Sequence, residues 1–296
     1  MGMSTFFTHV LNGVVLGMIY ALVAIGYSLI FSILRMINFS HGAVYAFGAV
    51  SVYTFTALLK INPWLALLLG IIITAGLDIA INKFGIEPLR KKQTEGNPTL
   101  ITTIGISYII QNSLVAAFGS NRRPFPTFYD FGMVDIGPIR IDSAKIFLFA
   151  VCGLLLLILM LIINKTHTGL GIKAVRQNPI TATLMGINVN WIITLIFCFA
   201  GISACIAGAL VAGYYQVVYP MMGVMMGNKT FASALLGGLG VLYGSVIGGI
   251  IIGVVEVLVA AYIGAAYRDA VSFVILIAIL IFKPEGLFGK KGISKV

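Results

Sequence analysis

The sequence predicts an all-α, polytopic membrane helical bundle with about eight or nine crossings, one of them a broken glycine-rich half-helix. Hydrophobic residues make up 59% of the 296 residues and charged residues only 9%, whereas about a quarter of the residues of a soluble protein are charged. Apolar runs of spanning length recur along the chain, with basic residues gathered in short segments between them. We therefore expect residues 1–296 to form a single transmembrane domain within a lipid bilayer.

Composition also argues against several classes of function. The formal net charge of +10 comes from basic residues dispersed between spans, where membrane orientation explains them, so we expect no nucleic-acid partner. Cys152, Cys198 and Cys205 fall inside apolar segments without metal-ligand spacing. We expect these thiols to pack as small apolar groups and expect no metal, cofactor or disulfide. A membrane-embedded enzyme ranks lowest, because the sequence offers no nucleophile-base cluster.

The predicted crossings follow the apolar runs in order. The first run lacks a basic leader and a cleavage site, so we take it as a retained span. A broken piece at 230–243 contains Gly237, Gly238 and Gly240, which indicates a half-helix with a glycine turn. The runs that approach the length of about 20 residues needed to cross a bilayer are 12–34, 42–59, 64–82, 99–118, 146–163, 191–218, 245–266 and 270–282.

Basic residues predict the orientation of these spans. Lys and Arg concentrate in 83–92, in 164–190 and in the tail from Lys283, which the positive-inside rule places in the cytoplasm. Three runs precede 83–92, so the N-terminus is expected outside, and nine crossings result if 230–243 also crosses. The connection 119–145 then lies outside, stiffened by prolines. It is compatible with a docking surface for an external partner and with a merely solvated connection.

Two polar patches interrupt the apolar pattern. The first, MINFSHG at 36–42, brings together Asn38, Ser40 and His41, and the second contains Asn228, Thr230 and Ser233 ahead of the glycine turn; these six residues are candidates for a translocation pathway. Transporters often bind substrate at paired broken segments. An interfacial turn with satisfied polar side chains remains an equal alternative for the first patch.

Glu256 lies near the middle of run 245–266, and Asp78 lies in run 64–82. An ionisable side chain inside a span is costly, so it indicates a function by default. No cation or histidine stands in the same run as Glu256, which favours a buried, hydrogen-bonded structural role. A pathway role and a proton relay stay open.

Gly13, Gly17 and similar pairs spaced four apart at 244–253 predict close helix packing.

The segment 164–190 contains its own predicted helix. Asn178 and Pro179 are typical of an N-cap and first helical residue, the helix continues through Met185, and Gly186 ends it. A basic turn that contains Lys173 and Arg176 is expected before it. We expect a compact knob that docks a soluble partner; a solvated amphipathic loop is the alternative.

Three motifs together resemble one family, the integral membrane permeases of branched-chain amino acid ABC transporters of the LivH type. They are MINFSHG at 36–42, GIKAVRQNP with TATLMGINV at 171–189, and TFASALLGGLGVLYGSVIGG at 230–249. The resemblance implies a permease subunit of an ATP-driven importer in the bacterial plasma (inner) membrane. Its implied partners are a second homologous permease, two cytoplasmic ABC ATPases and an extracytoplasmic solute-binding protein.

The resemblance also implies roles for residues. The coupling loop 164–190 would contact the ATPases, and the external loop would be 119–145. The residues implied in ATPase coupling are Lys173, Arg176, Gln177, Asn178, Pro179, Ile180, Ala182, Gly186 and Ile187. Family members commonly carry an acidic residue and Ala after the Asn/Asp-Pro, where this chain has Ile180 and Thr181, so partner contacts there would be apolar. The alternative function is a stand-alone channel or proton-coupled carrier that uses Glu256.

Overall fold

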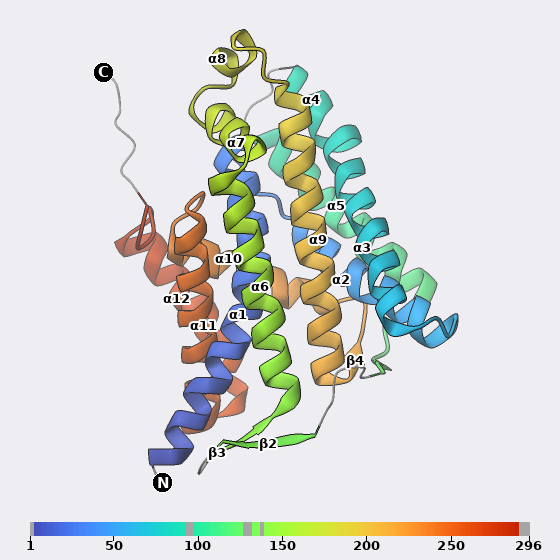
Figure 1. The fold of residues 1–296 in the computed structure, drawn as a ribbon, viewed down its shortest axis with the longest axis vertical. Coiled ribbons are helices and arrows are strands. Elements are labelled where there is room, and N and C mark those ends of the chain that lie inside the picture. The colour runs from blue at the N-terminus through green and yellow to red at the C-terminus, as the bar shows by residue number, and fades with distance from the viewer. Residues whose placement is uncertain (1–2, 93–96, 127–131, 137–138, 290–296) are drawn as a thin grey trace.

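A computed structural model describes residues 3–92, 97–126, 132–136 and 139–289. Almost all of this chain is helical (Figure 1). The helices are α1 (Met3–Leu34), α2 (His41–Tyr53) with the π-helical extension η1 (Thr54–Leu58), α3 (Pro63–Ala80) continued by η2 (Ile81–Ile86) and α4 (Glu87–Lys91), α5 (Asn97–Phe118), α6 (Ser143–Lys165), α7 (His167–Gln177), α8 (Pro179–Leu184), α9 (Val189–Tyr215), α10 (Met222–Gly237), α11 (Leu242–Tyr262), the 3-10 turn η3 (Ala265–Tyr267) and α12 (Arg268–Phe282).

Seven helices of the described chain are long and apolar enough to cross a membrane. They are α1, α3 with its extensions, α5, α6, α9, α11, and α12 with η3. The predicted polytopic helical membrane bundle is thereby confirmed. The remaining predicted crossings correspond to α2 and α10, which have 13 and 16 residues and bury most of their side chains inside the bundle.

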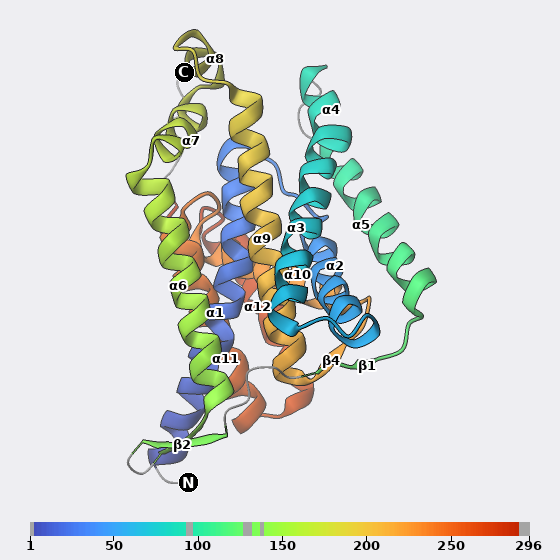
Figure 2. The same cartoon turned by 45° about the vertical axis from the view of Figure 1, so that its right-hand side comes forward.

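The two ends of the bundle carry different elements. Helices α7 and α8 project at one end, and the start of α1 lies at the other, beside the hairpin of β2 (Met133–Ile136) and β3 (Ile139–Asp142) (Figures 1 and 2). We call these the α7–α8 end and the hairpin end. The short pair of β1 (Arg123–Pro124) with β4 (Val217–Val218) also lies at the hairpin end. Of the predicted connection 119–145, residues 127–131 and 137–138 are outside the described chain.

The segment after α12 returns to the α7–α8 end. Glu285 and Phe288 line the same hollow as Lys173 and Arg176 of α7. The central polar segment and the tail therefore share one end of the bundle, and α1 starts at the opposite end, which agrees with the parity expected from the basic residues.

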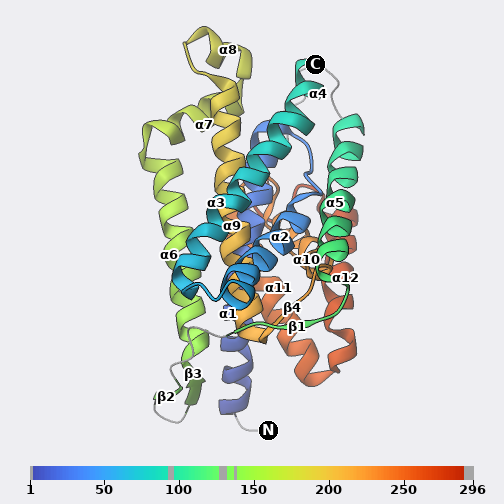
Figure 3. The ribbon, with the colours of Figure 1, turned by 90° about the vertical axis from the view of Figure 1, so that its right-hand side faces the viewer.

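Glycines allow the central helices to pack backbone against backbone. Helix α1 runs through the middle of the bundle and contacts α6, α9, α10 and α11 (Figure 3). A Cβ atom built on Gly13 would lie 2.5 Å from the Cα of Val254, and one on Gly17 would lie 2.5 Å from the Cα of Ile250. The predicted small-residue packing is thus found between α1 and α11. The two backbones are so close that no residue larger than glycine fits at these two positions.

Replacing Gly17 with leucine should therefore destabilise the fold by about 1–3 kcal/mol or more, because it forces two helix backbones apart. Thermal unfolding of detergent-purified protein, followed by the fraction that stays monodisperse, measures the loss. Gly105→Leu on α5 is the matched control, since no atom lies within 4 Å of its Cβ position. Equal losses of Tm in both variants would contradict the packing role of Gly17.

Two element boundaries differ from the sequence prediction. The basic segment 83–92, which follows the apolar run predicted to end at residue 82, continues the helix as far as Lys91. Pro88 occupies a first-turn position and Glu87 forms an i,i+4 ion pair with Lys91 at 2.7 Å, and both features favour a helix. The half-helix expected from residue 230 begins at Met222. It ends as predicted at a glycine turn, where Gly238 and Gly240 have φ of 101° and 83°.

Candidate functional site

The segment between α6 and α9 folds into two short capped helices, α7 and α8, which we call the knob (residues 167–187). The Asn178 side chain accepts hydrogen bonds from the backbone N–H of Ile180 at 2.9 Å and of Thr181 at 3.1 Å. The left-handed Gly186, with φ 82°, ends α8, and the N–H of Ile187 donates to the carbonyl of Ala182 at 3.0 Å. These contacts satisfy both ends of the helix. The predicted helix after Asn178 is present. The basic turn expected around Lys173 and Arg176 is instead helix α7, whose start is capped by the Thr166 hydroxyl accepting from the N–H of Gly169 at 3.2 Å.

The tip of the knob is apolar. Ile180, Leu184 and Met185 are 74%, 82% and 78% exposed, and α8 contains no charged residue. Ala182 is buried beneath them. Exposed apolar side chains that cluster on a projecting element are typical of a protein-protein contact.

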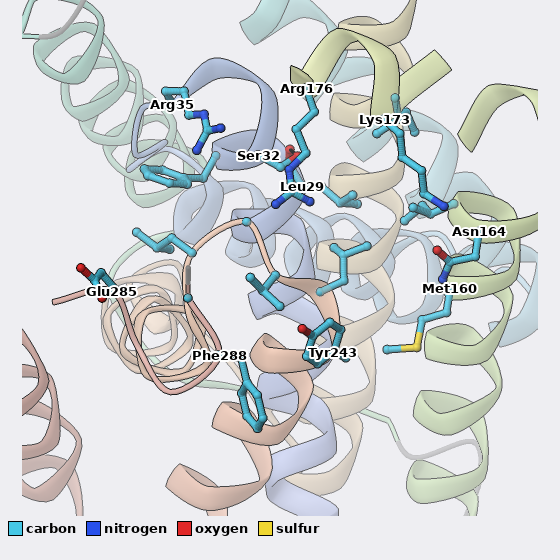
Figure 4. A pocket seen from close by; sticks show the side chains of 18 of the residues that line it. Leu29, Ser32, Arg35, Met160, Asn164, Lys173, Arg176, Tyr243, Glu285 and Phe288 are labelled. Atoms are coloured by element: carbon cyan, nitrogen blue, oxygen red, sulfur yellow. Dashed lines mark hydrogen bonds between the residues drawn. The ribbon is translucent and has the colours of Figure 1, made fainter. Parts of the chain in front are cut away.

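The basic side chains of the knob are directed toward the bundle and away from the apolar tip. Figure 4 shows Arg176 pointing from α7 toward Ser32 and Leu29 of α1, and Lys173 pointing toward Asn164. These side chains line a hollow of about 680 Å³ at the α7–α8 end. Arg176 and Arg35 also line a neighbouring hollow of about 820 Å³, together with Gln177, Asn178, Pro179 and Ile180.

The chain after α12 closes one side of the first hollow. The N–H of Leu287 donates to the carbonyl of Leu236 at 2.8 Å, and the N–H of Phe288 donates to that of Gly237 at 3.3 Å. These bonds satisfy carbonyls that the end of α10 would otherwise leave free. The tail thereby ties the glycine turn between α10 and α11 to the α7–α8 end.

The first polar patch is buried at the break between α1 and α2. Asn38, Ser40 and His41 are at most 1% exposed. The Asn38 Oδ1 accepts from the backbone N–H of Ser40 at 3.1 Å and from its hydroxyl at 2.6 Å. His41 Nε2 lies 3.3 Å from the carbonyl oxygen of Val23, and the His41 ring meets the edge of the Tyr27 ring. These contacts fix the start of α2 against α1.

The two broken segments meet inside the bundle. A Cβ atom built on Gly227 of α10 would lie 3.1 Å from the Cα of Gly42, the residue that follows His41. Asn228 and Gly42 line a hollow of about 270 Å³, which Gln111 of α5 also lines. The sequence did not point to Gln111, since a polar residue on an exposed helix gives no signal of what it faces.

The hydroxyl groups of Thr230 and Ser233 in α10 bond to their own helix. The Thr230 hydroxyl donates to the carbonyl of Met226 at 2.7 Å, and the Ser233 hydroxyl donates to that of Lys229 at 2.9 Å. Both side chains are fully buried. Their hydroxyl protons are therefore used within the helix.

Glu256 is the centre of a buried charge network at the hairpin end. Its carboxylate accepts from the Tyr20 hydroxyl at 2.8 Å, from Lys229 Nζ at 2.8 Å and from Arg268 Nε. Lys229 Nζ also lies 2.6 Å from Asp269 Oδ1. Four helices, α1, α10, α11 and α12, are joined through this one carboxylate.

Comparisons with known proteins identify the family of this chain. The family described as "Branched-chain amino acid transport system / permease component" matches residues 9–280. The chain belongs to this permease family. It is 35% identical to the "High-affinity branched-chain amino acid transport system permease protein LivH" of Salmonella typhimurium, over 98% of each chain. It is 33% identical to the BraD permease protein of Pseudomonas aeruginosa, over 97% of each chain.

Among solved structures, "PsaBC from Streptococcus pneumoniae in complex with Fab" overlaps with 94% of the permease and 92% of that chain. The sequence identity is 11% and the TM-score is 0.46, which is too low to support a structural argument.

The buried carboxylates of the permease differ in their partners. Glu256 is bonded to two cationic side chains and one hydroxyl, all from helices other than its own. A search for a partner within the run 245–266 alone could not find them. Asp78 is fully buried beside Gly201 of α9, and its carboxylate oxygens have no hydrogen-bond partner within the described ranges. A carboxylate with two cationic partners is typical of a structural ion network.

Proposed function

We propose that this permease is the membrane-spanning subunit of an ATP-driven importer for branched-chain or related amino acids. Separate cytoplasmic ATPase subunits would supply the energy, a second homologous permease would complete the membrane part, and an extracytoplasmic solute-binding protein would deliver the substrate. The family supports the transport role, and the names of LivH and BraD state branched-chain amino acids for those relatives. This chain itself would hydrolyse no ATP.

The observation that carries the proposal is the knob with its apolar tip. Two capped helices form an element that can be displaced as a unit, and Ile180, Leu184 and Met185 offer a contact surface on it. The knob is continuous with α6 and α9, and α9 packs against α2 and α3. A push on the tip by an ATPase would therefore be transmitted to the bundle by rigid helices.

The proposal places the α7–α8 end in the cytoplasm and the hairpin end outside, in the bacterial plasma membrane. The basic residues at the α7–α8 end, among them Arg35, Arg90 and Arg176, support this orientation. The connection 119–145 then faces the solute-binding protein. Asn228 and Gln111, which line the hollow beside the broken segments, are proposed pathway residues, with Asn38, Ser40, His41, Thr230 and Ser233 holding the segments in place.

Arg176→Glu tests the transmission step. The tagged permease, expressed with its genomic neighbours, should co-purify two ATPases, and this association should survive the substitution because Arg176 faces the bundle. Amino acid uptake stimulated by ATP should fall about five- to tenfold, the lower end of the range that typical coupling free energies produce, since a glutamate beside Arg35 and Lys173 would hold the knob against the bundle.

Arg176→Lys is the matched control and should keep most of the uptake. Normal uptake in the Arg176→Glu variant would contradict the transmission role, and a tagged permease that brings down no ATPase would contradict the proposed function.

A further inference from the structure

A hollow of about 380 Å³ lies at the hairpin end, in front of the Glu256 network. Arg122, which precedes β1, Val217 of β4 and Asp269 at the start of α12 all line it. This volume is in the range of sites for small molecules.

One side of the hollow offers an accessible carboxylate. Lys229 is 7% exposed and lies between Glu256 and Asp269, at 2.8 Å and 2.6 Å. The Asp269 side chain is 48% exposed. Its second oxygen, Oδ2, has no hydrogen-bond partner in the described part of the chain, so a cationic group in the hollow can reach it.

Guanidinium groups face the same hollow. Arg122 stacks over the ring of Tyr219 at 5.3 Å and forms no ion pair with any described carboxylate. Arg268 donates from Nε to Glu256 and from Nη2 to the Tyr215 hydroxyl, and among the described residues its Nη1 has no hydrogen-bond partner. Arginine is the side chain best suited to a carboxylate, because its planar fork matches the two oxygens.

The remaining wall is apolar and adaptable. Leu16, Val211, Met222, Met225 and Met226 line it. Methionine side chains are flexible and polarisable and pack against aliphatic groups of different shape. The hollow therefore combines an anionic group, cationic groups and an apolar wall within one small volume.

We propose that this hollow is an entry site for a zwitterionic amino acid with an aliphatic side chain. The α-ammonium group would bind Asp269, the α-carboxylate would bind Arg122 and Arg268, and the side chain would lie against the methionines. The buried ion pairs of Glu256 would hold Lys229 and Arg268 in position. The direction of entry rests on the proposed function, while the binding chemistry rests on the residues of the hollow alone.

The site is tested by asking whether millimolar L-leucine protects a cysteine placed in the hollow from chemical labelling, with the permease held in nanodiscs. Met225→Cys places a thiol in the hollow, because Met225 lines it and is 39% exposed. The rate at which this thiol reacts with a neutral methanethiosulfonate is measured. The permease without this substitution gives the background from the native cysteines. L-Leucine should slow labelling at concentrations about tenfold lower than 4-methylpentanoate, which lacks only the ammonium, or isoamylamine, which lacks only the carboxylate. Tenfold is the ratio commonly carried by one hydrogen bond between charged groups.

Asp269→Asn in the same background should abolish the preference for L-leucine over 4-methylpentanoate, and Asp269→Glu should retain it. An unchanged labelling rate without ligand verifies that each variant is folded. Equal protection by the three compounds, absence of protection, or a preference that survives Asp269→Asn would overturn the site. If ATPases co-purify and uptake occurs without protection, only this site fails; if L-leucine protects but ATP drives no uptake, the proposed function fails.

Discussion

Replacing Lys229 with methionine should destabilise the permease by about 3 kcal/mol, because the buried carboxylate of Glu256 then keeps a charge with an incomplete set of partners. Glu256 is fully buried and Lys229 Nζ lies 2.8 Å from it. Methionine is close to lysine in length and fills the space, so the loss reports the charge and not a cavity. Thermal unfolding of the detergent-purified permease measures the effect as a lowered Tm.

Two further variants separate this effect from a general sensitivity to mutation. Lys229→Met combined with Glu256→Gln should recover much of the lost stability, since both charges are then removed. Lys91→Met is the matched surface control: its ion pair with Glu87 is exposed on the lysine side and should contribute less than about 1 kcal/mol. Equal losses in the Lys229 and Lys91 variants would contradict the structural role of the network.

Ile180→Asp should detach the ATPase subunits from the permease. Ile180 is 74% exposed at the tip of the knob, so a partner that covers it would have to desolvate the new carboxylate, at a cost of several kcal/mol. That cost corresponds to a loss of at least about a hundredfold in affinity. The measurement is the amount of ATPase that co-purifies with the tagged permease from detergent.

Ile180→Leu keeps the apolar surface and should retain the ATPases. Leu184→Asp, at a neighbouring position of the same tip that is 82% exposed, should lose them as Ile180→Asp does. Normal co-purification with both aspartate variants would rule out the tip as the contact surface. Thermal unfolding should be unchanged in all three variants, because none of these side chains is buried.

The local features of the knob could be predicted from the sequence. A cap such as Asn178, a proline after it and a glycine at residue 186 act on their immediate neighbours, so adjacent residues carry the whole signal. The helical bundle itself was predictable for a similar reason, because an apolar run of spanning length needs no partner to be recognised.

The charge network could not be predicted, because its members are brought together only by packing. Tyr20 and Glu256 are 236 residues apart, and Lys229 lies in a different helix from the carboxylate it meets. The direction of Arg176 was hidden for the same reason: the sequence places this residue in the knob, but only the fold of α7 shows that its exposed side chain points toward the bundle.

The structure separates pathway candidates that line a hollow from candidates whose side chains bond to their own helix, and residue type alone does not show this difference. Asn228 and Thr230 stand two positions apart on α10, yet Asn228 lines a hollow and the Thr230 hydroxyl bonds to its own helix. Side chains two apart on a helix face different directions. Polar character therefore located the segment, and helix rotation determined which residue faces the hollow.

Reconstituted uptake tests the central claim most directly. Proteoliposomes that contain the permease with its co-purified ATPases should accumulate L-leucine supplied with the solute-binding protein only when ATP is present on the side of the knob. The permease alone should accumulate none. Uptake by the permease alone, driven by a pH gradient and abolished by Glu256→Gln, would contradict the account and would identify a proton-coupled carrier instead.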